Sequence, residues 1–156
     1  MIQKTIIANY GDPDLGKTTS VILVYKKLKE KGERTVICDP EYSNGDLCAV
    51  LTINGVKVGF SSLGDPYSSH REWLNKLIDD EKCPIILTAC RYSGVTEKFI
   101  ESKQPDYRVL WASNARLYEA GKGTSNIPAD IIDRFNDQWA TEIANMIESW
   151  SYAGKE

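Results

Sequence analysis

The chain has 156 residues, a formal net charge of −3 and a hydrophobic fraction of 42%, and these values together predict one folded domain. The charge pattern holds no basic stripe, so it gives no indication of nucleic-acid binding. No apolar run is long enough to cross a bilayer and no apolar leader precedes the first strand-like segment, and we therefore expect a cytoplasmic protein with no membrane partner.

The first expected elements are a strand, a glycine-rich loop and a helix. Residues 4–9 are strand-like, residues 17–31 carry a helical apolar stripe, and residues 11–18 between them read GDPDLGKT. In the pattern G-x-x-x-x-G-K-[ST] the backbone N–H groups point at phosphate oxygens, the lysine reaches the β- and γ-phosphates, and the hydroxyl ligates Mg²⁺. The helix that follows adds the positive end of its dipole, so we predict a nucleotide phosphate site.

Through this loop and its flanks the chain resembles the P-loop NTPase superfamily. The resemblance covers about the first 35 residues and a general β/α rhythm after them, and it singles out no family within the superfamily. It implies that Lys17 acts on the phosphates during catalysis and that Thr18 is a Mg²⁺ ligand. The residues it implies for nucleotide binding are Gly11, Asp14, Leu15, Gly16, Lys17, Thr18 and Thr19.

Three loop residues depart from an ideal phosphate cradle. Asp12 and Asp14 add carboxylates, and Pro13 removes one N–H group. A carboxylate about 6 Å from a phosphate charge costs roughly 3 kcal/mol at an effective dielectric constant near 20. The alternatives are that the acids point outward, that they help to hold metal, or that nucleotide binds weakly.

A strand, a loop and a hairpin are expected after the first helix. We predict the strand at 35–38 and the polar loop at 41–46. Two β-like runs, 47–53 and 56–61, are joined by an Asn-Gly pair, which is typical of a type I′ hairpin turn.

The rest of the chain alternates helix and strand, with a final helix opening near Pro128. We expect a helix with a Ser69-x-x-Glu72 capping box, and we expect His70 in its polar first turn to be solvated rather than a catalytic base. The further elements expected are a strand at 84–90, a helix at 95–103 and a strand at 107–112. The apolar stripe of the last helix, expected to dock on the sheet, is Ile131, Phe135, Trp139, Ile143, Ile147 and Trp150.

This order of elements predicts an α/β domain over residues 1–156. We expect a three-layer, P-loop NTPase-like fold, with a mostly parallel sheet, one antiparallel hairpin arm and helices on both faces. The cysteines lie in or beside apolar runs without C-x-x-C spacing, so we expect buried thiols rather than disulfides or zinc ligands. They are Cys38, Cys48, Cys83 and Cys90.

Polar residues are expected at the carboxyl edge of the sheet, where open α/β sheets bind their ligands. Asp65 and Asp39 compete to hold Mg²⁺; we favour Asp65, since in small P-loop kinases the acid at the place of Asp39 often contacts the phosphate acceptor. Arg91 and Arg116 follow two strands and can neutralise charge on a transferred phosphoryl group, although each is equally well explained as a surface arginine.

Three functions follow from these residues, all with ATP, because residues 113–116 lack the N-K-x-D pattern that reads guanine. The first is Mg²⁺-dependent hydrolysis of ATP or transfer of its γ-phosphoryl group to a small acceptor, though no arginine-rich nucleotide-kinase lid is present. The second is a slow ATPase that acts as a switch with a protein partner, suggested by residues 61–65 after the hairpin. The third is a nucleotide-binding fold with little turnover, suggested by Asp12 and Asp14.

Overall fold

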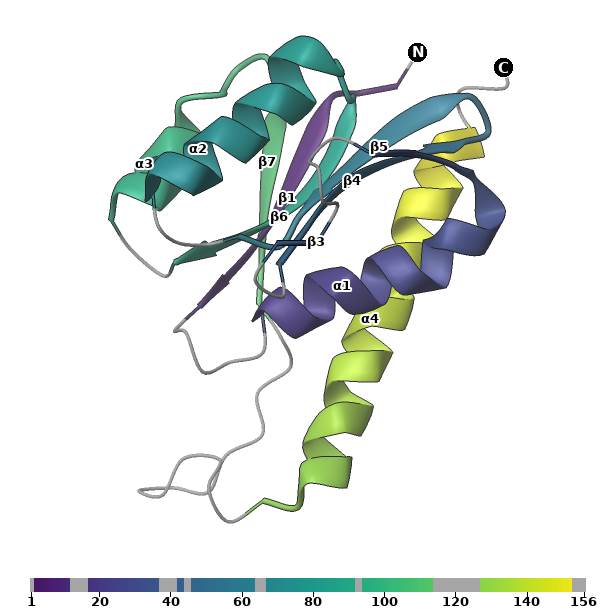
Figure 1. Ribbon diagram of the computed structural model, residues 1–156. Coiled ribbons are helices and arrows are strands. Elements are labelled where there is room, and N and C mark those ends of the chain that lie inside the picture. Colours follow the sequence, from purple (N-terminus) through teal and green to yellow (C-terminus); the bar gives the residue numbers. More distant parts are fainter. Residues whose placement is uncertain are drawn as a thin grey trace.

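The computed structural model describes residues 2–11, 17–36, 42–43, 46–63, 67–91, 94–113 and 127–152. Within these ranges strands and helices alternate along most of the chain (Figure 1). The strands are β1 (Thr5–Gly11), β2 (Glu33–Val36), β3 (Tyr42–Ser43), β4 (Asp46–Ile53), β5 (Val56–Ser61), β6 (Ile85–Arg91) and β7 (Arg108–Ala112). The helices are α1 (Lys17–Leu28) with a 3-10 turn η2 (Lys29–Lys31), α2 (Tyr67–Asn75) with a π-helical continuation η3 (Lys76–Asp80), α3 (Val95–Glu101) and α4 (Ala129–Ser151).

Six strands form one sheet in the order β2-β4-β5-β6-β1-β7, and β3 pairs beside them with the start of β4. The β1–β6, β1–β7 and β5–β6 pairs are parallel, whereas β4 is antiparallel to both of its neighbours β5 and β2. All strands of this path except β4 therefore end at the same edge, which we call the carboxyl edge. The expectation of a mostly parallel sheet with one antiparallel arm is confirmed.

Helices cover both faces of the sheet, as expected (Figure 1). One face packs against α1 and α4, and there the core includes Ile7 of β1 and Leu87 of β6. The other face packs against α2 and α3, and there the neighbouring residues Ile6 and Ile86 are buried. Central strands covered on both sides are apolar at successive positions for this reason. No helix in the described part of the chain is long and apolar enough to cross a membrane.

The hairpin turn is the local feature that the sequence predicted best. Asn54 and Gly55 have φ angles of 53° and 82°, which is the left-handed pair that a type I′ turn requires. The turn sets the register of β4 on β5, in which Ile53 pairs with Val56. The prediction of two strands joined by this turn is confirmed.

Two local expectations are wrong. Helix α2 begins at Tyr67, so Ser69 lies inside the helix and no capping box opens there. Part of the expected 41–46 loop is the short strand β3, in which Tyr42 pairs with Leu47. A pairing of two residues leaves no periodic pattern in a sequence, which is why it was missed.

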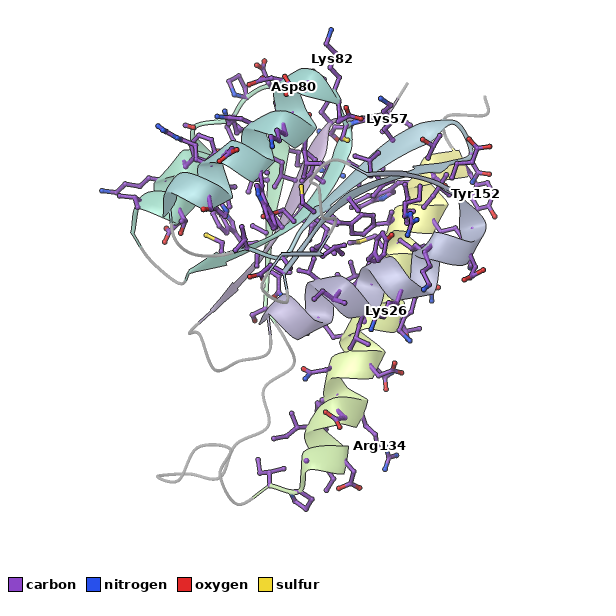
Figure 2. The ribbon with its side chains drawn as sticks, viewed as in Figure 1. Lys26, Lys57, Asp80, Lys82, Arg134 and Tyr152 are labelled. Carbon is purple, nitrogen blue, oxygen red and sulfur yellow. The ribbon has the colours of Figure 1, made fainter. Side chains whose placement is uncertain are left out.

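The last helix docks on the sheet through its C-terminal part only. Ile147 is fully buried against α1 and the sheet, whereas Phe135 keeps 38% of its surface exposed. Figure 1 shows that the first half of α4 extends past the sheet, and Figure 2 labels Arg134 on this half. The expectation that the whole stripe docks is therefore wrong for its N-terminal end, because the helix is longer than the surface beneath it.

Candidate functional site

The glycine-rich motif begins at the end of one element and finishes inside the next. Strand β1 ends at Gly11, and α1 begins at Lys17, so the backbones of Lys17, Thr18 and Thr19 form the first turn of that helix. Strand β1 has a parallel partner on each side, β6 and β7, and α1 packs on the sheet beside it. The motif thus joins an inner parallel strand to the N-terminus of a packed helix. Asp14, Leu15 and Gly16 lie outside the described residues.

Arg91 is brought next to the motif by the sheet register. It is the last residue of β6, and its backbone pairs with that of Gly11. On the other side of β1 the pairing with β7 ends at Asn9 and Ala112. Arg116, which follows β7, is outside the described residues.

The strand order separates the two candidate acids, although Asp39 and Asp65 themselves lie outside the described residues. Neighbouring strands lie about 4.8 Å apart. Strand β5, which leads to Asp65, is two places from β1, a lateral distance of about 10 Å. Strand β2, which leads to Asp39, is four places from β1, a lateral distance of about 19 Å. Both strands point to the carboxyl edge, but β2 is the outermost strand there.

The end of β5 is held to β4 by a buried serine. The Ser62 hydroxyl accepts a hydrogen bond of 2.7 Å from the Leu47 N–H and donates one of 2.9 Å to the Asp46 carboxylate. The Ser62 N–H in turn donates to the Leu47 carbonyl at 2.9 Å. Ser62 is fully buried, so these bonds fix the point from which the chain leaves toward Asp65.

His70 is buried, so the expectation of a solvated residue is wrong. It lies in α2 with none of its surface exposed, and its Nε2 is 3.1 Å from the Ala89 carbonyl oxygen of β6. Because a carbonyl only accepts, Nε2 carries the proton. The ring also meets Phe99 of α3 edge to face, with centroids 6.2 Å apart. The polar neighbours of His70 in the sequence gave no sign that this one helix position faces the sheet.

Further buried polar residues near this edge were not predicted as site residues. Asn9 is fully buried in β1, close to Gly11. In the next strands Ser61 and Thr88 pair with each other, and both are fully buried. The Ser61 hydroxyl has no hydrogen-bond partner among the described residues. Polar residues that interrupt apolar strand ends were the signal available in the sequence.

The cysteines behave as expected where the structure describes them. Cys48, Cys83 and Cys90 are buried free thiols, and Cys38 lies outside the described residues. Burial raises the pKa of the Cys83 thiol to about 12, with Glu81 adding to the effect, so this thiol is protonated at neutral pH. The Tyr107 hydroxyl donates to the Cys83 carbonyl at 2.5 Å, and this bond lies at the sheet edge opposite the motif.

The described residues contain no group of three or more His, Cys, Asp or Glu side chains placed to hold a metal. A metal at the carboxyl edge would therefore depend on few protein ligands. Mg²⁺ suits such a place, because it is usually held by one or two protein oxygens together with substrate phosphates and water. The Thr18 hydroxyl and one aspartate carboxylate are donors of that kind.

Comparison of the chain with protein-family models, with curated proteins and with solved structures finds no match in any of the three.

Proposed function

We propose that the chain is an ATP-binding protein with a P-loop, and that with Mg²⁺ it hydrolyses ATP or transfers the γ-phosphoryl group to a small acceptor. One observation carries the proposal: the sequence G-x-x-x-x-G-K-T starts at the carboxyl end of β1 and finishes in the first turn of α1. A phosphate cradle needs this strand–loop–helix order, because loop N–H groups and the helix N-terminus then converge on one anion.

The roles within the loop follow from the chemistry of its residues. Lys17 supplies a positive charge to the β- and γ-phosphates, and the Thr18 hydroxyl ligates Mg²⁺. The remaining nucleotide-binding positions, Gly11, Asp14, Leu15, Gly16 and Thr19, offer mainly their backbone N–H groups. Bound Mg²⁺ would neutralise phosphate charge and bridge the β- and γ-oxygens.

Asp65 is the better candidate for the metal-side acid. It follows β5, about 10 Å to the side of β1, and a side chain together with one bridging water spans such a gap. The register supports the same choice, since Ser61 is level with Ala8 of β1 through Thr88. Four residues further on, Asp65 is therefore level with the start of the loop. Asp39, about 19 Å to the side, suits a group remote from the metal.

Arg91 is proposed to act on the γ-phosphate. Its backbone lies opposite Gly11, one strand from the start of the loop, and a guanidinium at this point can stabilise charge that develops on the phosphoryl group. Arg116 follows the strand on the other side of β1 and stays a second candidate for the same role.

The test is ATP binding and hydrolysis by the wild type and by two lysine variants of α1. Lys17→Ala is expected to lose about 100-fold or more in turnover, the typical effect of removing one group that stabilises transition-state charge. Lys26→Ala is the matched control, because Lys26 is exposed later on the same helix (Figure 2) and should leave turnover unchanged.

Two results would count against the proposal: a wild type that neither binds nor hydrolyses ATP with Mg²⁺, or a Lys17→Ala variant as active as Lys26→Ala. Adding nucleosides, nucleotides and small metabolites then separates the two reactions. ADP formation that depends on one added compound indicates phosphoryl transfer, whereas formation independent of all of them indicates hydrolysis.

A further inference from the structure

Helix α2 begins just after Asp65, and a single buried hydrogen bond joins its first turns to β6. The bond runs from His70 Nε2 to the Ala89 carbonyl at 3.1 Å. Phe99 of α3 packs against the edge or face of the same imidazole, so the ring is held in place by a second helix. The position of the N-terminus of α2 is therefore tied to the sheet through His70.

Ala89 lies at a particular place in β6. The pairing of β5 with β6 ends at Ser61 and Thr88, so Ala89 is the first β6 residue beyond it. The pairing of β6 with β1 continues to Arg91 and Gly11, at the start of the loop. His70 thus contacts β6 between the end of β5 and the residue that meets the motif.

The segment that carries Asp65 leaves and re-enters the fold at two fixed points. At one end Ser62 is held to β4 through Leu47 and Asp46. At the other end His70 holds α2 to β6. The distance between these points and β1 sets how far the Asp65 carboxylate lies from nucleotide bound in the loop.

We propose that His70 is a positioning residue for the metal-side acid: its hydrogen bond to Ala89 sets the distance between Asp65 and the Mg²⁺–nucleotide. The inference rests on the proposed function. His70 acts through the backbone of α2 and touches neither metal nor nucleotide. Groups that orient metal ligands in this way commonly change metal affinity or activity by about 10- to 100-fold when they are removed.

The first experiment compares three variants. His70→Leu removes the hydrogen bond, His70→Gln keeps an amide N–H that can reach the same carbonyl, and Tyr107→Phe is the matched control. Tyr107 also donates from a buried side chain to a backbone carbonyl, that of Cys83, but at the opposite edge of the sheet. The measurements are the Mg²⁺ concentration for half-maximal ATP hydrolysis, the Kd of an ATP analogue without Mg²⁺, and Tm.

His70→Leu is expected to raise the Mg²⁺ concentration for half-maximal hydrolysis by about 10-fold or more, while the Mg²⁺-free Kd stays close to that of the wild type. His70→Gln should restore the Mg²⁺ dependence. Tyr107→Phe should lower Tm much as His70→Leu does, yet leave the Mg²⁺ dependence unchanged. A wild-type Mg²⁺ dependence in His70→Leu, or the same change in Tyr107→Phe, would overturn the inference.

A second measurement needs no variant, because His70 is the only histidine in the chain. Tag-free protein labelled with ¹⁵N-histidine gives one pair of ring nitrogen signals by NMR. We expect the Nε2–H tautomer, and we expect these signals to move when Mg²⁺ is added to protein that already holds the ATP analogue. Signals that stay the same before and after Mg²⁺ overturn the inference even if His70→Leu does not fold. Failure of the wild type to bind the analogue would instead refute the proposed function.

Discussion

Replacing Ser62 by Ala tests how firmly the end of β5 is held. The substitution removes the acceptor of the buried Leu47 N–H and the donor to the Asp46 carboxylate. A buried N–H left without a partner costs about 1–3 kcal/mol. The lost bond to Asp46 adds less than a fully buried one, because Asp46 is half-buried and water can replace the hydroxyl. We expect a total loss of about 2–4 kcal/mol in the free energy of unfolding.

The assay is urea unfolding followed by tryptophan fluorescence, together with Tm from circular dichroism. A domain of this size loses about 2–4 °C in Tm per kcal/mol, so Ser62→Ala should unfold about 5–15 °C lower than the wild type. Ser102→Ala is the control, because its hydroxyl also bonds to a backbone carbonyl but is exposed, and it should change stability by less than about 0.5 kcal/mol. Asp46→Ala should cost less than Ser62→Ala, since Leu47 keeps its partner. A Ser62→Ala loss below about 0.5 kcal/mol would refute the reasoning.

Three further predictions concern packing and pH. A Cβ added at Gly59 would lie 3.0 Å from a carbon of the helical layer, so Gly59→Ala should lose about 1–3 kcal/mol by urea unfolding, and a more stable variant would show that this layer can shift. Burial raises the pKa of Cys83 and of Tyr107 to about 12, so the folded state keeps protons that the unfolded chain releases; the free energy of unfolding should fall as pH rises from about 9 to about 12, and less steeply in Cys83→Ala, whereas parallel profiles would contradict the assignment. Ile147→Ala should cost about 2–5 kcal/mol and Phe135→Ala less than about 1 kcal/mol by the same assay, and similar losses would show that the projecting half of α4 is packed after all.

Local chemistry explains which parts of the fold were predictable. The turn at Asn54 and Gly55 and the opening of α4 after Pro128 depend on the backbone preferences of a few residues, and both are where the sequence predicts them. The alternation of elements also predicted the parallel sheet and the helices on both faces. The length of the surface beneath α4 is not local, and so the exposure of Phe135 was missed.

The candidate site was predictable in its loop and not in its surroundings. The motif from Gly11 to Thr18 is a contiguous pattern, whereas the lateral distances of Asp39 and Asp65 depend on strand order. Strand order is set by crossovers between distant segments, and a periodic pattern contains no information about it. The burial of His70 has the same origin, since it depends on where α2 crosses β6.

The position of β4 between β2 and β5 has a consequence for the order of folding. The β4–β5 hairpin closes through a two-residue turn, so it makes its contacts early and at a small cost in loop entropy. Strand β1 has no such neighbour, because its partners begin at Ile85 and Arg108, far along the chain. The strand that leads into the phosphate loop is thus the one whose pairing needs nearly the whole chain. We expect nucleotide binding to appear during refolding only with the slowest folding phase, and stopped-flow measurements with a fluorescent ATP analogue can follow it.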